Sequence, residues 1–268
     1  MQKEIFIMKK IAKITGTLAA LTLAVQVAFA DQKGYDIMKQ VADFKEPAFN
    51  HSLVTLTLKD KSGTAEDWVI EEYGKSENGL ASLVMLFRKG AKKDTRFLQI
   101  QNDGKPDDKY IYLPGLSTRR VNSNEGSKSF LGTDATYDDL TTRDVDQDEH
   151  DYLGDESKNG YDCYKIRETP KDAKSSQYAY RITWIDKKTM YPIYTEMYNK
   201  NNKLVKTLTV NKIEKRTGAT GVTYDIPLSN TLLDVSTGHS TTLTITQMEL
   251  DKPIPARVFT EAFLKTGK

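Results

Sequence analysis

The segment Leu80-Ala-Ser-Leu-Val-Met-Leu-Phe-Arg88 decides the fold class of this chain. Its centre, from Leu83 to Phe87, is apolar at every position, so an extended strand would carry apolar side chains on both faces. Phe97-Leu98 beside Ile100 has the same character. A sheet with one solvated face alternates instead, so both sides of this region must be shielded from water. We expect the first helix to cover one side, while the other side lines an apolar cavity or is filled as ordinary core.

Runs with a period of two, rich in β-branched and aromatic residues, extend from this segment in both directions. Turn sequences such as Asp60-Lys-Ser-Gly63 and Asn102-Asp-Gly104 separate them and are typical of tight antiparallel connections. Ten or so strands with few helices predict a mainly β (α+β) fold, a large curved sheet or open barrel in one domain. The predicted strands are 53–58, 68–73, 80–88, 96–101, 109–120, 161–168, 177–186, 191–199, 204–213, 220–226 and 241–249.

Three segments differ from this pattern. Apolar residues between Ile37 and Phe44 recur at helical spacing, and Pro47 ends the pattern, which predicts one short helix before the strands. Residues 121–155, rich in Ser, Asn, Asp and Gly, are too long for a routine connection and predict a functional loop or small helical insert. Phe259 to Leu264 predicts a short closing helix or strand.

The first thirty residues have the pattern of a removable export signal. Lys9, Lys10 and Lys13 precede an apolar run, and Ala28-Phe29-Ala30 is a cleavage signature. We therefore expect residues 1–30 to be a signal peptide cleaved after Ala30, residues 31–268 to form a single periplasmic domain, and the mature chain to have no transmembrane span.

Charge and cysteine content exclude two classes of function. Removing residues 1–30 changes the count from 39 basic and 37 acidic residues to 35 and 36, a net charge of −1. The chain therefore lacks the basic excess that nucleic acid binding demands. The one cysteine, Cys163, has no CxxC partner or nearby histidine, so we expect a buried strand residue and neither a disulfide nor a nucleophile.

No motif for catalysis or a cofactor is present. The three histidines, His51, His150 and His239, are isolated, which leaves zinc unsupported, and phosphate-binding and serine-nucleophile motifs are missing. The stretch from Asp144 to Glu149 begins like a calcium-binding loop, but Glu149 stands where the turn glycine is needed. We expect a solvated acidic loop, no metal, no cofactor and no enzymatic activity.

The middle third of the chain resembles the outer-membrane lipoprotein-sorting family, the LolA-like group. The resemblance is carried by Lys109-Tyr-Ile-Tyr-Leu-Pro-Gly115, the basic pair Arg119-Arg120, and Ser129-Phe-Leu-Gly-Thr-Asp134 followed by Tyr137-Asp-Asp-Leu140. It extends loosely over most of the mature chain. Ala135 departs from the pattern, because the family usually has an aromatic residue there.

This resemblance implies a half-open antiparallel β-barrel whose helices form a lid over an apolar cavity for acyl chains. It favours the cavity interpretation of the two-sided strand and makes Arg119 and Arg120 candidate headgroup contacts, although solvated strand-edge charges explain the pair equally well. With the expected strand register, the predicted ligand-binding residues are Leu56, Leu58, Trp68, Ile70, Leu83, Met85, Phe87, Tyr112, Phe130, Leu131 and Tyr137.

The sequence hypothesis is a periplasmic protein that binds and transfers lipid or lipoprotein acyl chains. Its partners would be a lipid or an acylated lipoprotein, and a membrane exporter or outer-membrane acceptor. The alternative is a sensor or adaptor of a membrane complex, since carrier and sensor share a fold. We further expect residues Val121 to Leu140, with Gly126 and Gly132, to gate the cavity or to form a static wall.

Overall fold

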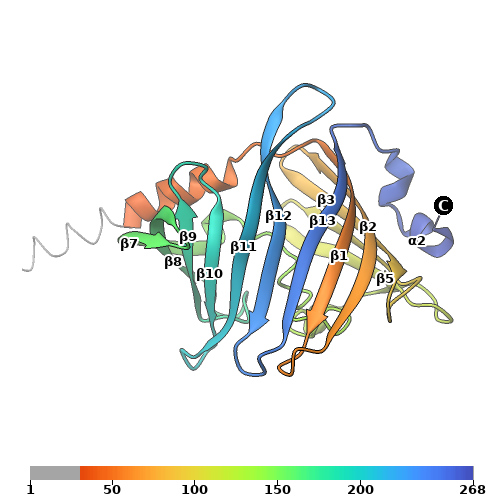
Figure 1. The fold of residues 1–268 in the computed structure, drawn as a ribbon, viewed down its shortest axis with the longest axis horizontal. Helices are drawn as coiled ribbons and strands as arrows, with labels where there is room; N and C mark the ends of the chain where they lie inside the picture. The colour runs from red at the N-terminus through yellow and green to blue at the C-terminus, as the bar shows by residue number, and fades with distance from the viewer. Residues whose placement is uncertain (1–30, 268) are drawn as a thin grey trace, which may run out of the picture.

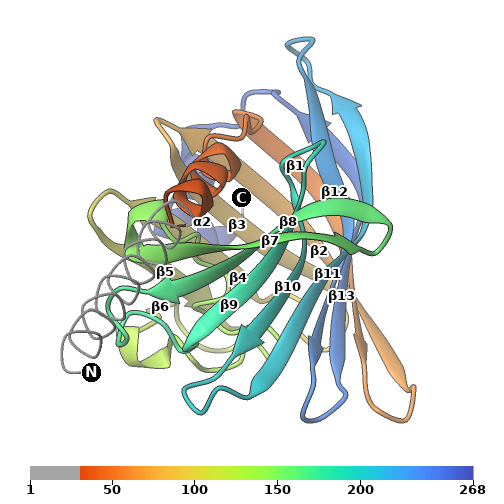
Figure 2. The same ribbon diagram turned by 90° about the vertical axis from the view of Figure 1, so that its left-hand side faces the viewer.

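A single antiparallel sheet of thirteen strands forms the structure, a computed structural model that describes residues 31–267. The predicted signal peptide lies outside the described residues. The sheet is strongly curved (Figures 1 and 2), which confirms the mainly β, half-open barrel class. Its strands are β1 Phe49–Lys59, β2 Ala65–Glu77, β3 Leu80–Lys89, β4 Arg96–Asn102, β5 Lys105–Tyr112, β6 Arg119–Arg120, β7 Asp148–Lys158, β8 Tyr161–Pro170, β9 Tyr180–Asp186, β10 Pro192–Tyr198, β11 Leu204–Thr217, β12 Thr223–Asp234 and β13 Ser240–Leu250.

The strand order explains the long irregular segment. The sheet runs β6-β5-β4-β3-β2-β1-β13-β12-β11-β10-β9-β8-β7, so the chain starts in the middle, travels to one edge at β6, and resumes at the other edge at β7. Residues 121–147, here called the crossover loop, connect these two edges. A connection between opposite edges of a curved sheet has to cross it, which is why this loop is long.

The segment predicted as loop or insert is therefore partly strand. Its last part forms β7, and the rest contains two short 3-10 helices, η1 Ser123–Glu125 and η2 Val145–Gln147. The sequence of β7 is mostly charged, as is common for an edge strand, so its β character was not visible in the propensities. The predicted strand 109–120 is likewise wrong as one element, because Pro114 and Gly115 separate β5 from β6.

The apolar strand β3 is shielded on both faces, but not by the element we expected. A helix precedes the strands, as predicted, but it spans residues 31–42 and not Gly34 to Phe44. Its Ile37 packs against Ile166 of β8 and Ile185 of β9, far from β3 in the strand order. The C-terminal elements η3 Ala256–Phe259 and α2 Glu261–Thr266 cover β3 and β4 instead. Their apolar cluster consists of Val84, Leu86, Leu98, Val258, Phe259, Phe263 and Leu264.

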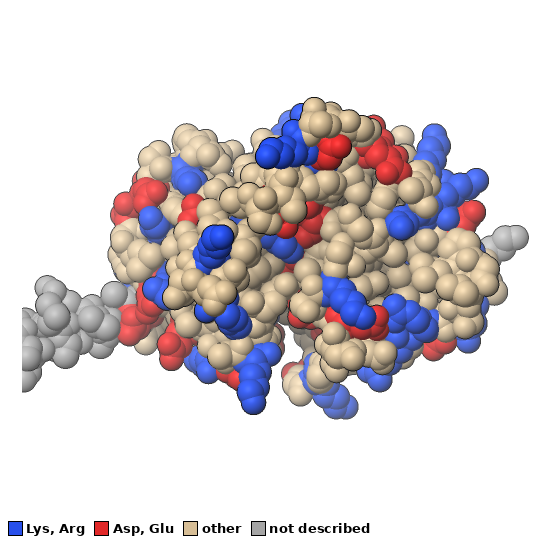
Figure 3. All heavy atoms as spheres, turned by 90° about the horizontal axis from the view of Figure 1, so that it is seen from below, with Lys and Arg blue, Asp and Glu red and all other residues tan. Residues whose placement is uncertain are grey.

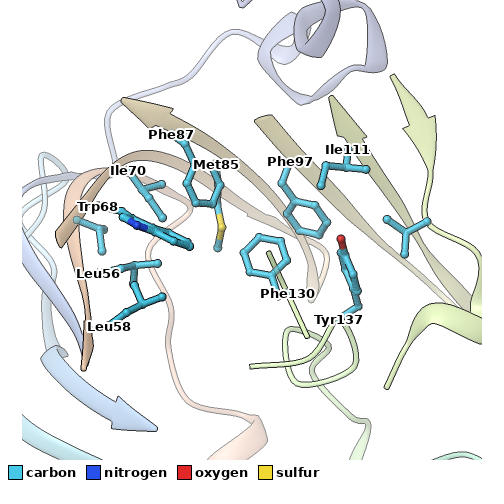
Figure 4. Packing of buried hydrophobic residues seen from close by; sticks show 12 residues of the cluster. Leu56, Leu58, Trp68, Ile70, Met85, Phe87, Phe97, Ile111, Phe130 and Tyr137 are labelled. Atoms are coloured by element: carbon cyan, nitrogen blue, oxygen red, sulfur yellow. The ribbon is translucent and has the colours of Figure 1, made fainter. Parts of the chain in front are cut away.

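Helix α2 lies outside the curved sheet (Figure 1). The opposite, concave face of β1 to β5 carries the largest apolar cluster, which includes Phe87 and Phe97 together with Phe130 and Tyr137 of the crossover loop (Figure 4). Side chains at alternate positions of β3 thus pack into two separate apolar clusters, one on each face of the sheet. Among residues 31–267, no helix is both long enough and apolar enough to cross a membrane.

Candidate ligand-binding cavity

All the predicted ligand-binding residues except Tyr112 gather on the concave face. They come from neighbouring strands and from the crossover loop, and Figure 4 shows most of them pointing toward one another. The buried members of this cluster are Leu56, Leu58, Trp68, Ile70, Met85, Phe87, Phe130 and Tyr137, with Leu83 and Leu131 packed against them.

Tyr112 is a correction to the predicted set. It packs with the cluster under the C-terminal helix, and the guanidinium carbon of Arg96 lies 4.4 Å from its ring centroid. Its neighbour Ile111 points to the concave face instead. Because Tyr110, Ile111 and Tyr112 are all apolar or aromatic, the sequence did not reveal which of them faces inward.

Much of the predicted site is closed core, because the loop fills it. Phe130 is 3% exposed, and its ring centroid lies 4.9 Å from that of Phe97, 5.5 Å from Tyr137 and 6.2 Å from Phe87. The Phe97 and Tyr137 rings meet Phe130 edge to face, an arrangement that stabilises packing beyond area burial, and the Phe87 ring is tilted against it. Phe130 therefore occupies the space that we had predicted for a ligand.

An open cavity of about 380 Å³ lies next to this core. Leu83, Leu140 and Ile245 border the cavity and also pack against the cluster, so the two are continuous. The volume is within the range of about 300–1,000 Å³ that small-molecule sites have. Residues outside the predicted ligand-binding set complete its apolar wall; they are Phe44, Pro47, Tyr191, Tyr224, Ile226, Pro227, Met248 and Leu250.

Gly74 makes room on the β2 side of the cavity. It pairs with Asn50 of β1 and Leu83 of β3, and both of these residues also border the cavity. The three atoms nearest to a Cβ atom on Gly74 would all belong to Asn50, and the closest, at 3.5 Å, would be in ordinary van der Waals contact. A glycine inside a strand often marks such an approach or opening, so Gly74 is a sequence signal for the cavity.

Polar contacts fasten the crossover loop across the sheet at two points. Asp139 accepts hydrogen bonds from Lys206 Nζ of β11 and from the Tyr178 hydroxyl, each at 2.8 Å. Asp134 lies 2.8 Å from His239 Nδ1 and accepts a 2.7 Å bond from the Thr241 hydroxyl. Burial, together with Asp139, raises the pKa of Tyr178.

A buried lysine anchors the same loop from the other side. Lys109 of β5 donates to the Tyr137 carbonyl at 2.8 Å and to the Thr141 hydroxyl at 2.6 Å. Burial lowers the pKa of this amine, since the charged form loses its hydration. The loop thus rests on both halves of the sheet through hydrogen bonds to β5, β11 and β13.

Gly126 and Gly132 of the crossover loop have different structural roles. A Cβ on Gly126 would come within 2.2 Å of Asp138 Oδ1, so this glycine permits a close approach inside the loop. Gly132 has φ +98°, follows Leu131 with φ +57°, and lies in a turn closed by a 3.0 Å bond from Thr133 N to the Phe130 carbonyl. The turn presents Phe130 to the core.

The basic pair lies on the edge strand β6. Arg119 forms two hydrogen bonds to Glu125, at 2.8 and 3.2 Å, and Arg120 is paired with Asp108. The Arg119 guanidinium is the main reason why the pKa of Glu125 falls to about 2. Neither arginine borders the cavity. The structure therefore places both at the strand edge, and their headgroup role stays a prediction.

The structure offers no nucleophile or metal site among the described residues, and no basic binding surface on the face seen in Figure 3. Cys163 is fully buried, and burial raises its pKa to about 11, which is opposite to what a nucleophile needs. In the described part of the chain, no cluster of three or more His, Cys, Asp or Glu residues could hold a metal ion. Lys, Arg, Asp and Glu are interspersed on the face seen in Figure 3, unlike the basic stripe of a nucleic-acid-binding surface.

Comparison with known proteins agrees with this architecture. A family model described only as "uncharacterized protein" matches residues 79–266, which is more than half of the chain. The comparison with curated proteins gives no match.

Three solved structures share the fold. A DUF1329 family protein from Desulfovibrio piger has a TM-score of 0.80 at 23% identity, over 88% of this chain and 99% of its own. An outer-membrane lipoprotein-sorting protein domain from Vibrio parahaemolyticus has 0.79 at 22%, with the same coverage. A LolA superfamily protein from Nitrosomonas europaea has 0.65 at 16%, over 86% and 98%. The chain therefore belongs to the family of this model, and it shares its fold with the outer-membrane lipoprotein-sorting protein domain and the LolA superfamily protein.

Proposed function

We propose that the protein is a periplasmic carrier that binds acyl chains of a lipid or lipoprotein in the cavity beside the crossover loop. The observation that carries this proposal is the continuity of the cavity with the apolar concave core through Leu83, Leu140 and Ile245. Its wall is mainly apolar and its charged groups, including Lys45, Glu46 and Asp225, are few. An acyl chain would extend the core, as a side chain does.

The expected driving force is burial of methylene groups, at about 0.8 kcal/mol each. Such binding needs no catalyst, so we propose no enzymatic step. A carrier must also release its ligand, and this requires an acceptor with higher affinity or a change in the cavity. A membrane exporter or an outer-membrane acceptor is the partner that the carrier proposal requires.

Native mass spectrometry of the purified protein tests the proposal. We expect part of the population to carry an added mass that dissociates as a lipid or an acylated peptide. Delipidated protein should bind a fatty acyl probe in one-to-one stoichiometry. If delipidated protein binds no acyl probe of any chain length, the carrier proposal is wrong.

We also propose that residues Val121 to Leu140 gate the cavity, because Leu140 borders it and Phe130 fills the adjacent core. Spin labels at Ser127→Cys and Lys203→Cys measure the distance from the loop to the β10–β11 turn, and buried Cys163 will resist labelling. We expect this distance to change when an acyl ligand is added.

The control pair is Lys203→Cys with Lys215→Cys, both at exposed positions along the β10–β11 turn and β11, and its distance should stay constant. If the loop distance also stays constant while the ligand binds, the loop is a static wall.

A further inference from the structure

Uncharged polar side chains gather at the β1–β4 end of the cavity. In one row of the sheet, Asn50, Gly74, Leu83 and Gln99 are successive cross-strand partners from β1 to β4, and all four border the cavity. Gly74 has no side chain, so this row has a gap beside Asn50. The atoms nearest to a Cβ placed on Gly74 include Asn50 Nδ2, at 3.9 Å, so the Asn50 amide lies beside this gap.

The next row repeats the arrangement with a second amide. Ser76 and Ala81 are cross-strand partners on β2 and β3, the Ala81 N–H donates to Gln101 Oε1 of β4 at 3.0 Å, and all three residues border the cavity. Residues two apart on one strand are roughly 6.6 Å apart, and neighbouring strands about 4.8 Å, so one ligand headgroup can contact both rows. The polar residues of the two rows, here called the polar wall, are Asn50, Ser76, Gln99 and Gln101.

The amides of the polar wall have unused donors. Asn50 and Gln101 are each held through the side-chain oxygen, which accepts one hydrogen bond. No described residue accepts a hydrogen bond from Asn50 Nδ2 or Gln101 Nε2. Each amide therefore presents N–H groups that a ligand oxygen can accept.

Gln99 is bonded in the opposite sense. Its side chain is buried, with 7% exposure, and its Nε2 donates to Asp107 at 2.7 Å and to the Leu140 carbonyl at 3.1 Å. These two acceptors fix the orientation of the amide, because the reversed amide would place oxygen against oxygen. Gln99 Oε1 is thereby buried without a donor among the described residues. Buried acceptors in this state call for a donor from outside the chain.

Formal charge lies away from the polar wall. Of the charged residues that border the cavity, Lys75 and Asp225 each form an ion pair with a residue that does not border it. Lys45 and Glu46 are exposed, adjacent in the chain and opposite in sign. Glu72, two residues before the glycine on β2, does not border the cavity. A headgroup at the wall therefore meets neutral donors and acceptors.

We infer that the polar wall binds an uncharged headgroup that both donates and accepts hydrogen bonds, the chemistry shared by a glycerol hydroxyl and an amide. The inference rests on the proposed function, which supplies the acyl chain, and it adds the class of headgroup. Hydroxyls and amides offer an acceptor to Asn50 and Gln101 and the donor that Gln99 Oε1 lacks. A carboxylate has acceptors only, and it would be buried here without a counter-charge.

Isothermal titration calorimetry with ligands that share a decanoyl chain, each below its micelle concentration, tests the inference. The ligands are monodecanoylglycerol, methyl decanoate, which has the same ester but no hydroxyl, and decanoate, which is an anion at pH 8. We expect monodecanoylglycerol to bind about 5- to 150-fold more tightly than methyl decanoate, the effect of two net hydrogen bonds. Decanoate should bind most weakly.

The decisive variant combines Asn50→Leu with Gln101→Met, which removes both amides and keeps similar side-chain sizes. The affinity ratio of monodecanoylglycerol to methyl decanoate should fall by about fivefold or more, while the affinity for methyl decanoate stays unchanged and shows that the cavity is intact. Gln247→Met, at an exposed position of β13, is the matched control and should keep the wild-type ratio.

A double variant with the wild-type ratio, or a wild type that binds monodecanoylglycerol no better than methyl decanoate, overturns the inference and leaves the carrier proposal standing. If no decanoyl ligand binds to the wild type, both are wrong.

A measurement on the wild type keeps the inference testable if the double variant does not fold. In proton–nitrogen correlation spectra, the side-chain amide resonances of Asn50 and Gln101 should shift with monodecanoylglycerol more than with methyl decanoate, while that of Gln247 stays in place. Unshifted resonances with bound monodecanoylglycerol would contradict the polar wall. N-decanoylglycinamide separates the two sources of the headgroup: binding tighter than that of monodecanoylglycerol indicates an acylated peptide, and weaker binding a glycerolipid.

Discussion

Replacing Asp139 with alanine should lower the free energy of unfolding by about 3–5 kcal/mol, because it leaves a buried lysine without its counter-charge. The side chains of Asp139 and Lys206 are only 11% and 10% exposed, and their charged atoms lie 2.8 Å apart. The same carboxylate also accepts from the Tyr178 hydroxyl and from the backbone N–H of Thr136. Its removal thus breaks a hydrogen-bond network that joins the crossover loop to the far half of the sheet.

Urea denaturation followed by tryptophan fluorescence measures this loss. Asp103→Ala is the matched control, because Asp103 is exposed in the β4–β5 turn and its side chain has no partner among the described residues. The double variant Asp139→Ala with Lys206→Ala should lose less than the sum of the single variants, since it leaves neither charge unpaired. A loss below about 1 kcal/mol for Asp139→Ala would mean that the pair is solvated.

Local patterns in the sequence predicted the elements and buried faces that depend only on neighbouring residues along the chain. The helix at 31–42 followed from apolar spacing and Pro47. The two-sided burial of β3 followed from five consecutive apolar residues, and both cores exist. What covers each face did not follow, because the C-terminal helix reaches β3 only through a contact about 170 residues away along the chain, and no periodicity encodes such a contact.

The position of the cavity depends on the topology in the same way. Its far wall belongs to β12 and β13, which reach Asn50 and Gly74 because β13 pairs with β1. The predicted residues were found on the right face, but the crossover loop returns over that face and fills it with Phe130. The sequence predicts a loop that gates the cavity or forms a static wall, and only the edge-to-edge strand order gives the reason for its inward path.

Replacing Gly74 with valine should weaken acyl-chain binding by about 5- to 150-fold while the fold is retained. The first added carbon has room, since its nearest neighbour would be Asn50 at 3.5 Å, an ordinary van der Waals contact, and Gly74 does not have the positive φ that strains other residues. The two methyl groups then project into the space that the ligand needs. Overpacking costs about 1–3 kcal/mol, and each 1.4 kcal/mol corresponds to a tenfold change in affinity.

The Gly74→Val protein should bind acyl chains more weakly while its melting temperature stays the same or rises. This combination separates a blocked cavity from misfolding. Glycine inside a strand is destabilising by about 0.5–1 kcal/mol relative to alanine, so the ligand-free Gly74→Val protein should melt at or above the wild-type temperature. Gly74→Ala should weaken binding less than Gly74→Val does, and Ala65→Val, at the exposed start of β2, should leave binding unchanged. Dodecanol titration of these variants measures the series. A stable Gly74→Val protein with wild-type affinity would place the acyl chain outside the cavity bordered by β2, and the carrier proposal would then need a different site.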